Sequence, residues 1–511
     1  MKVANWLLRY RAGIYISLCA ALLLGAALGV LSGNASAGTA VYACLLCMLC
    51  LMPSLWMERV NDRYALLAVF MGAYFLFFGA LSLKVVLLGS DTDTVPEISD
   101  DFMTAAQLAV LLGAGLVLAG YRLGASMVPR AVQGAVVTDW SNTSVLGIGL
   151  ACSVLGSGAM VYYTIFVTPE NTVRATTQGL AAMGPVLTFL VMLGQLIQPL
   201  GLLILAYGYA KNRTPFWLGL VLALILLQLI LGFAIDSKGV ALLGILLVAI
   251  TQTLWDNKLP KAWLAGVVVF AIVIFPVFQA ARVERGDRGL DRQQAVQRLC
   301  EVWARAWESR EKVNEGKHRS QTFLERSSND ALELIFEHVG VDKPFLNGGT
   351  LVALPYAFIP RLLIPDKEDV PVGQLFNHVF LHGASDDFTY ISVSELGEFY
   401  WNFGWPGVIF GMLLTGLLLG FTGAKSSLAE VHSLTRLLVL VITIKMLCFG
   451  FGGSIALSYV VWMRAMAAIG LLHLAFARAS PDAQHTRSPA EPATGQITVG
   501  PAPRPRVSNF L

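Results

Sequence analysis

Long apolar stretches recur along most of this chain, and short polar turns separate them. A helix needs about 20 apolar residues to cross the hydrocarbon core of a bilayer, which is about 30 Å thick. The sequence therefore predicts an all-α polytopic membrane protein with about twelve transmembrane helices. The expected spans are 13–32, 38–56, 64–88, 103–121, 144–166, 183–208, 214–234, 239–255, 262–281, 397–421, 433–450 and 455–477.

One hydrophilic insertion, 282–395, interrupts this pattern and divides the chain. We expect an N-terminal membrane bundle of about nine spans over 1–281 and a C-terminal bundle of about three spans over 396–478. The tail, 479–511, is rich in Pro, Ala and Ser and has few large apolar residues. Such a composition does not offset the entropy lost on ordering, so the tail is predicted to be disordered.

Basic residues mark every second short loop, which predicts the orientation of the chain. Lys and Arg concentrate in short cytoplasmic loops, whereas long loops are exempt from this rule. Both termini are therefore expected in the cytoplasm, and 282–395 becomes a large periplasmic loop that contains membrane-surface helices. The basic residues that set this alternation are Lys2, Arg9, Arg11, Arg59, Arg63, Arg122, Arg130, Lys211, Arg213, Lys258, Lys261, Lys425 and Arg436.

Composition supports the membrane class and removes others. The chain is 56% hydrophobic and only 14% charged, with a mean hydropathy of +0.65, which is far from a soluble domain. Its net charge of +3 over 511 residues and the lack of basic clusters among aromatics argue against nucleic acid. Six of the seven cysteines lie in apolar runs and are expected to be packing residues.

Four cations fall within or at the ends of predicted spans, where each costs about 2.5–3.5 kcal/mol at the helix centre. They are Lys84, Lys238, Lys445 and Arg464. All four fall toward the outer half of the membrane, at the depth of the phosphates of a lipid carrier. Snorkelling to the interface is the alternative. Lys238 lies in a short Ser-Lys-Gly turn where a helix N-terminus favours an anion, and pairing with Asp236 is the alternative there.

The insertion changes character along its length. Its first part, 282–320, reads mainly as a solvated charged helix, although Arg282 directly follows a span and is expected at the membrane surface. From Arg326 the run RSSNDALELIFEHV predicts a helix on or in the membrane surface. Prolines at 355, 360 and 365 then forbid a continuous helix, which places Arg361 and Lys367 on a stiff, broken backbone. A guanidinium group held in this way suits a pair of diphosphate oxygens.

Together these features resemble the bacterial oligosaccharide repeat-unit polymerases, the Wzy-type O-antigen and exopolysaccharide polymerases. The resemblance rests on the Ser-Lys-Gly turn at Lys238, the arginine-led helix at 326, IPRLLIPDK (359–367) and GEFYWNFGWPG (397–407). It covers the second half of the chain closely and the first half by topology. Ile364 stands where the family pattern has Trp, and Glu368 stands where it has Pro.

The resemblance implies transfer of a growing polysaccharide from undecaprenyl diphosphate to a lipid-linked oligosaccharide repeat unit, without a metal or cofactor. It places the protein in the bacterial inner membrane, with a chain-length regulator and a flippase as partner proteins. Such a reaction needs cations for the departing diphosphate and a base for the acceptor hydroxyl. The cations available for diphosphate binding are Lys238, Arg282, Arg326, Lys367 and Arg464, with Arg361 as a catalytic group.

The candidate bases are Glu395, Glu398, His378 and His382. The two glutamates lie three residues apart at the mouth of a span, on one helix face. Structural pairing with Arg361 or Arg326 is the alternative. Tyr400 and Asn402 are candidates for sugar contact, together with His378 and His382, which could also be loop histidines without a catalytic role. Gly404 and Gly407 are interpreted as helix-packing residues.

Two other functions remain open at this point. An O-antigen-ligase-like transferase would use the same donor and pass the glycan to another acceptor, and acceptor choice lies in pocket shape. A lipid-linked oligosaccharide flippase or exporter would move its cargo, but its polar site is expected near the midplane between repeats. The single large one-sided insertion favours the polymerase.

Overall fold

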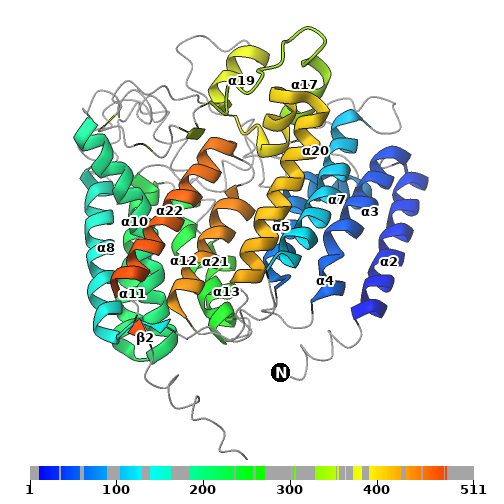
Figure 1. Cartoon of the computed structure of the whole chain (residues 1–511). Coiled ribbons are helices and arrows are strands. Elements are labelled where there is room, and N and C mark those ends of the chain that lie inside the picture. The colour runs from blue at the N-terminus through cyan, green and yellow to red at the C-terminus, as the bar shows by residue number, and fades with distance from the viewer. Residues whose placement is uncertain are drawn as a thin grey trace, which may run out of the picture.

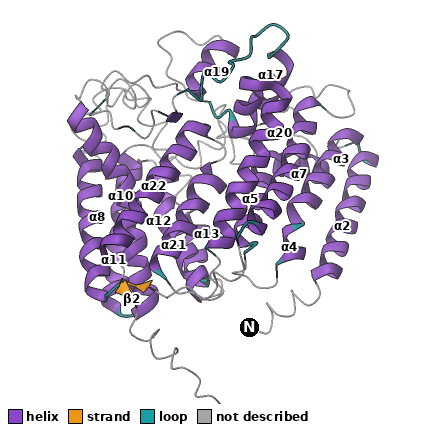
Figure 2. Ribbon diagram, in the orientation of Figure 1, coloured by secondary structure: helices purple, strands orange, loops and turns teal. Residues whose placement is uncertain are grey.

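A computed structural model describes most of the two predicted membrane bundles and part of the insertion. The described residues are 11–33, 36–57, 63–88, 104–128, 138–162, 185–234, 238–256, 260–270, 301, 304–305, 329–352, 354–355, 359, 363, 372–381, 391–426, 433–450, 453–476 and 478–479. Helices make up nearly all of this part of the chain (Figure 2).

The helices run in the order that the apolar stretches predict, and each of the twelve predicted ranges overlaps at least one of them. They are α2 (Arg11–Leu31), α3 (Ala37–Leu51), α4 (Pro53–Trp56), α5 (Ala65–Phe78), α6 (Ala80–Leu88), α7 (Ala105–Ser126), α8 (Asn142–Tyr162), α10 (Pro185–Asn212), α11 (Pro215–Ala234), α12 (Lys238–Asp256), α13 (Lys261–Val269), α17 (Asn329–His338), α19 (Val372–Phe380), α20 (Ser394–Lys425), α21 (Leu434–Thr443), the π-helical turn η4 (Ile444–Cys448) and α22 (Ile455–Phe476).

Seven of the described helices are long and apolar enough to cross a membrane, and α5 with α6 makes an eighth if the bent pair counts as one span. The structure therefore confirms an all-α membrane protein, while the number of twelve crossings stays a prediction. The expected continuous helix over 64–88 is instead two helices, bent by 58°. The break falls at Gly79, a residue with low helix propensity.

The closest helix pair is α7 with α20, and glycines on both helices bring their backbones into contact. A methyl group at Gly120 or Gly124 would overlap the carbonyl oxygens of Leu413 or Leu417. Across the contact, Gly416 and Gly420 lie in the same way against the backbone of α7. Small residues four apart permit this approach in membranes, where no hydrophobic effect drives helices together.

A second close pair, α8 with α10, forms in the other half of the bundle. A methyl group at Gly156 would lie 2.6 Å from backbone atoms of Gln198, and one at Gly201 would lie 2.5 Å from the backbone nitrogen of Ser153. Two glycine-mediated pairs thus organise the bundle, and α20, which carries the candidate site, belongs to one of them.

The first and last described elements lie at the end of the bundle opposite to the described helices of the insertion. A two-stranded antiparallel pair joins β1 (Thr138–Asp139), just before α8, to β2 (Arg478–Ala479), just after α22. In Figure 1, β2 and the start of α2 lie at the lower end, whereas α17 and α19 lie at the upper end.

Residues of two predicted basic loops lie close together. The Tyr121 hydroxyl donates a hydrogen bond to the carbonyl oxygen of Arg63, which joins the ends of two loops that the alternation assigns to one side. The guanidinium of Arg122 lies 4.2 Å from the ring centroid of Trp56. Neighbouring basic loops therefore share one end, as the alternation predicts; the compartment that this end faces remains a proposal.

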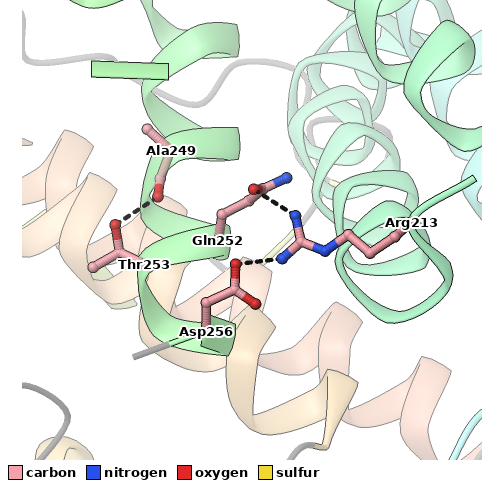
Figure 3. Close-up of polar contacts among 5 residues, drawn as sticks. All are labelled: Arg213, Ala249, Gln252, Thr253 and Asp256. Carbon is pink, nitrogen blue, oxygen red and sulfur yellow. Dashed lines mark hydrogen bonds and ion pairs between the residues drawn. The ribbon is translucent and has the colours of Figure 1, made fainter. Parts of the chain in front are cut away.

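An arginine clamp ties the α10–α11 connection to the last turn of α12 (Figure 3). Arg213, in a left-handed conformation with φ 52°, donates through Nη1 to Oε1 of Gln252 at 2.9 Å and through Nη2 to Asp256. The neighbouring Asn212 pairs with Asn142 at the start of α8, which places the clamp near β1. The clamp therefore lies at the end opposite to α17.

Candidate functional site

Helix α20 is broken near its beginning, and this break shapes the candidate site. Gly404 has φ 63° and ψ −149°, a left-handed conformation that glycine adopts without steric cost, and Pro406 follows it. The first part, 394–403, folds against the second: a methyl group at Gly411 would lie 2.5 Å from the ring of Phe399. Gly404 thus serves as the break point, whereas Gly407 and Gly411 provide the predicted close packing.

The two glutamates among the candidate bases lie on this first part and are completely buried. Glu395 and Glu398 each have 0% exposure, and they lie close to each other. The backbone N–H of Ile455, at the start of α22, donates a 2.8 Å hydrogen bond to Oε2 of Glu398. A hydrogen bond of 3.2 Å joins Tyr459 Oη to Oε2 of Glu395. The two carboxyl groups therefore contact different positions along the same helix.

Asn402 lies one turn further along the same face and links the site to the insertion. Its Nδ2 donates to Oγ1 of Thr350 at 2.7 Å and to the carbonyl oxygen of Glu398 at 2.8 Å. The backbone N–H groups of Leu346 and Asn347 donate to the carbonyl oxygens of Trp401 and Asn402. The described segment around Thr350 is thus docked directly beside the glutamates.

Three acceptor oxygens of this cluster have no hydrogen-bond partner among the described residues. They are Oε1 of Glu395, Oε1 of Glu398 and Oδ1 of Asn402, and all three residues have 0% exposure. Because both Nδ2 bonds of Asn402 fix its amide orientation, Oδ1 is the remaining acceptor. Buried polar atoms are usually paired. Three hydrogen-bond acceptors without a partner therefore lie on one face of the helix, where they can accept hydrogen bonds from donor groups.

Aromatic rings cover the site toward α17. Tyr400 stacks on Phe336 with ring centroids 3.7 Å apart, and its edge also faces Trp405. Leu332 and Ile335 of α17 lie against Gly397, which has no side chain to keep them away. Tyr400 is only 9% exposed and packs as a core residue here, so its contact with sugar stays a prediction.

Half of the predicted cations lie outside the described residues, while Lys84 and Lys445 lie within them on α6 and η4. Arg464 lies on α22, five positions after Tyr459, and is partly exposed. The backbone of Lys238 begins α12, which agrees with the expected helix N-terminus, but its side chain is not among those described. His378 lies in the last turn of α19 and is partly buried. The remaining candidates, which lie outside the described residues, are Arg282, Arg326, Arg361, Lys367 and His382.

Tyr459, Thr415 and Thr350 contact the cluster and were not among the sequence candidates. Tyr459 and Thr415 lie within apolar spans, and Thr350 follows the Gly-Gly pair of the insertion. A polar group inside a span is a signal that could have found the first two. Their partners are 64 and 44 positions away, so spacing along the sequence does not connect them.

Comparison with known proteins gives no family for this chain. No protein-family model, curated protein or solved structure matches it.

Proposed function

We propose that this protein is a membrane glycan polymerase that transfers a growing polysaccharide from undecaprenyl diphosphate to a lipid-linked oligosaccharide repeat unit. The observation that carries the proposal is the buried pair Glu395 and Glu398, each with an unfilled carboxyl oxygen, beside a segment of the insertion. A transferase needs such a base, and the arginines and lysines of the insertion supply the charge that complements a diphosphate.

In the proposed reaction, a hydroxyl oxygen of the acceptor repeat unit attacks the anomeric carbon of the sugar joined to the carrier diphosphate. The new glycosidic C–O bond forms as the C–O bond to the diphosphate breaks. The hydroxyl proton passes to a carboxylate of the glutamate pair, and the electron pair leaves with undecaprenyl diphosphate. Arg361, Lys367, Lys238, Arg282, Arg326 and Arg464 are the proposed cations for that leaving group.

The unfilled Oδ1 of Asn402 provides an acceptor for a sugar hydroxyl close to the base. Tyr400, His378 and His382 remain the proposed glycan contacts. A sugar hydroxyl that donates to Asn402 would be oriented relative to Glu398, which lies one helical turn away. Positioning of this kind is a large part of what a transferase contributes.

The proposal includes the membrane arrangement. About twelve helices cross the bacterial inner membrane, both termini face the cytoplasm, and the insertion faces the periplasm. Its support is the alternation of basic loops together with the placement of β2 and α17 at opposite ends of the bundle. A chain-length regulator and a flippase are the proposed partner proteins.

The test is removal of the protein from its native host, followed by separation of surface glycans by length. Loss of long chains while single repeat units still reach the surface supports polymerisation. Accumulation of repeat units on the cytoplasmic side would instead identify a flippase, and long chains that stay on the carrier lipid would identify a ligase. Complementation with Arg361→Ala or Lys238→Ala tests the proposed diphosphate contacts, which are wrong if both variants restore normal chain length.

A further inference from the structure

A chain of three buried hydrogen bonds leads away from Glu395. Oε2 of Glu395 lies 3.2 Å from the Tyr459 hydroxyl, which lies 2.6 Å from Oγ1 of Thr415. The Thr415 hydroxyl lies 3.0 Å from the carbonyl oxygen of Gly411. Thr415 is 1% exposed and Tyr459 is 9% exposed, so water has little access to this chain.

The direction of the first bond fixes the orientation of the Tyr459 hydroxyl. Tyr459 donates its single proton to Oε2 of Glu395, so its oxygen is left to accept from the Thr415 hydroxyl. Oε2 of Glu395 is thus an acceptor, a role that a neutral and an ionised carboxyl group both permit. The groups around Glu395 therefore decide its protonation state.

The groups that face Glu395 give its charge no compensation in the described part of the chain. They are Glu398 on the same helix, Tyr459 on α22 and Cys448 on η4. Each of these is neutral or negative. A buried carboxylate beside a second carboxylate is costly unless one of the pair holds a proton.

Glu398 has a different environment, which favours its ionised form. Its Oε2 accepts the N–H of Ile455, the first residue of the 22-residue helix α22. Free N–H groups and the positive end of the helix dipole stabilise a negative charge at this position. Two carboxyl groups in contrasting environments often divide the roles of acid and base.

We propose that Glu395 carries a proton and Glu398 is ionised, so that Glu398 is the base and Tyr459 is a positioning residue that holds the neutral Glu395. The protonation states rest on burial and on the groups that face each carboxyl group, whereas the role of base rests on the proposed function. Glu395 then contributes a neutral hydrogen-bonding group that lets Glu398 keep its charge. The unfilled Oε1 of Glu398 is the atom that receives the acceptor proton.

Infrared difference spectroscopy of the purified full chain in lipid nanodiscs at neutral pH tests the protonation states without any substrate. The wild type minus Glu395→Gln spectrum should contain the carbonyl band of a protonated carboxyl group, and the wild type minus Glu398→Gln spectrum should lack it. Gln at either position keeps the existing hydrogen bonds, since its amide oxygen can accept from Tyr459 or from Ile455. The band in the Glu398 spectrum alone, or in neither spectrum, overturns the proposal.

Two further variants test the role of the hydrogen-bond chain, and a structural role alone would not move their readout. Tyr459→Phe removes the donor to Oε2 of Glu395, so the band should persist and move to the position of a carboxyl group whose carbonyl oxygen accepts no hydrogen bond. Thr415→Val leaves that donor in place and is the control, so the band should stay near its wild-type position. The proposal fails if Tyr459→Phe removes the band or leaves its position unchanged.

Activity then distinguishes this inference from the proposed function. Glu398→Gln should lower polymer synthesis by at least about 100-fold, the usual minimum for loss of a general base, and Glu395→Gln should lower it less than Glu398→Gln does. If the wild type makes no polymer, the proposed function is wrong, while the infrared spectra still test the protonation states. If Glu395→Gln is the inactive variant, the two roles are reversed.

Discussion

The backbone N–H of Ile455 donates a 2.8 Å hydrogen bond to Oε2 of Glu398, across 57 positions of sequence. This bond joins the first part of α20 to the N-terminus of α22 and buries the carboxyl group between them. The other carboxyl oxygen, Oε1, has no hydrogen-bond partner among the described residues. A carboxylate held through one oxygen, with the other available, has the geometry that a general base requires.

Glu398→Gln should therefore abolish most activity without unfolding the protein. The amide oxygen of Gln can still accept from Ile455, so the monodisperse elution of the purified protein should be retained. Polymer synthesis should fall by at least about 100-fold, because the amide cannot take a proton. Glu337→Gln, an exposed position on α17, is the matched control and should behave as wild type.

The glycine contact between α7 and α20 predicts a position-specific loss of stability. A side chain at Gly420 would collide with the carbonyl of Tyr121, whereas one at Gly115 on α7 meets nothing within 4 Å. Gly420→Leu should destabilise the protein by at least about 2 kcal/mol, within the range for overpacking. Thermal unfolding in detergent measures this effect. Equal losses for Gly420→Leu and Gly115→Leu would contradict the packing account.

Aromatic contacts hold α19 on α20, so removing one ring should release that helix. Phe376 is 1% exposed, stacks on Phe380 at 4.7 Å and faces the edge of Trp401. A nine-residue helix is too short to be stable without such contacts. Phe376→Ala should lower the local stability of α19 by about 3–5 kcal/mol. Hydrogen exchange over 372–380 measures it.

The control for this effect is Phe410→Ala, since Phe410 on α20 is 72% exposed. Exchange over 372–380 should be unchanged in that variant. Protection of α19 that survives Phe376→Ala would mean that other contacts hold the helix.

The arginine clamp at the lower end of the bundle should matter little for stability and not at all for catalysis. The side chains of Arg213 and Asp256 are 40% and 36% exposed, and exposed ion pairs contribute about 0–1 kcal/mol. Asp256→Asn should therefore lower the free energy of unfolding by less than about 1 kcal/mol and leave polymer synthesis intact. Loss of synthesis in this variant would contradict the placement of the site at the opposite end.

The sequence predicts the helices well because apolar length alone identifies a span, as α2, α7 and α22 illustrate. It also identifies Glu395 and Glu398 as exceptional, since two acids three residues apart stand at the start of an apolar run. It does not predict the break at Gly404, because the apolar pattern continues through the Gly-Trp-Pro segment while the backbone adopts a left-handed conformation. Tyr459 and Thr415 were missed for another reason: contact with Glu395 depends on how α20 and α22 pack.

Synthesis of long glycans by the purified protein tests the central claim most directly. Proteoliposomes that contain only this protein and lipid-linked repeat units should produce a ladder of lipid-linked chains and release undecaprenyl diphosphate, and Glu398→Gln should produce neither. The account is contradicted if the repeat units stay at their original length, or if Glu398→Gln gives the same ladder as the wild type.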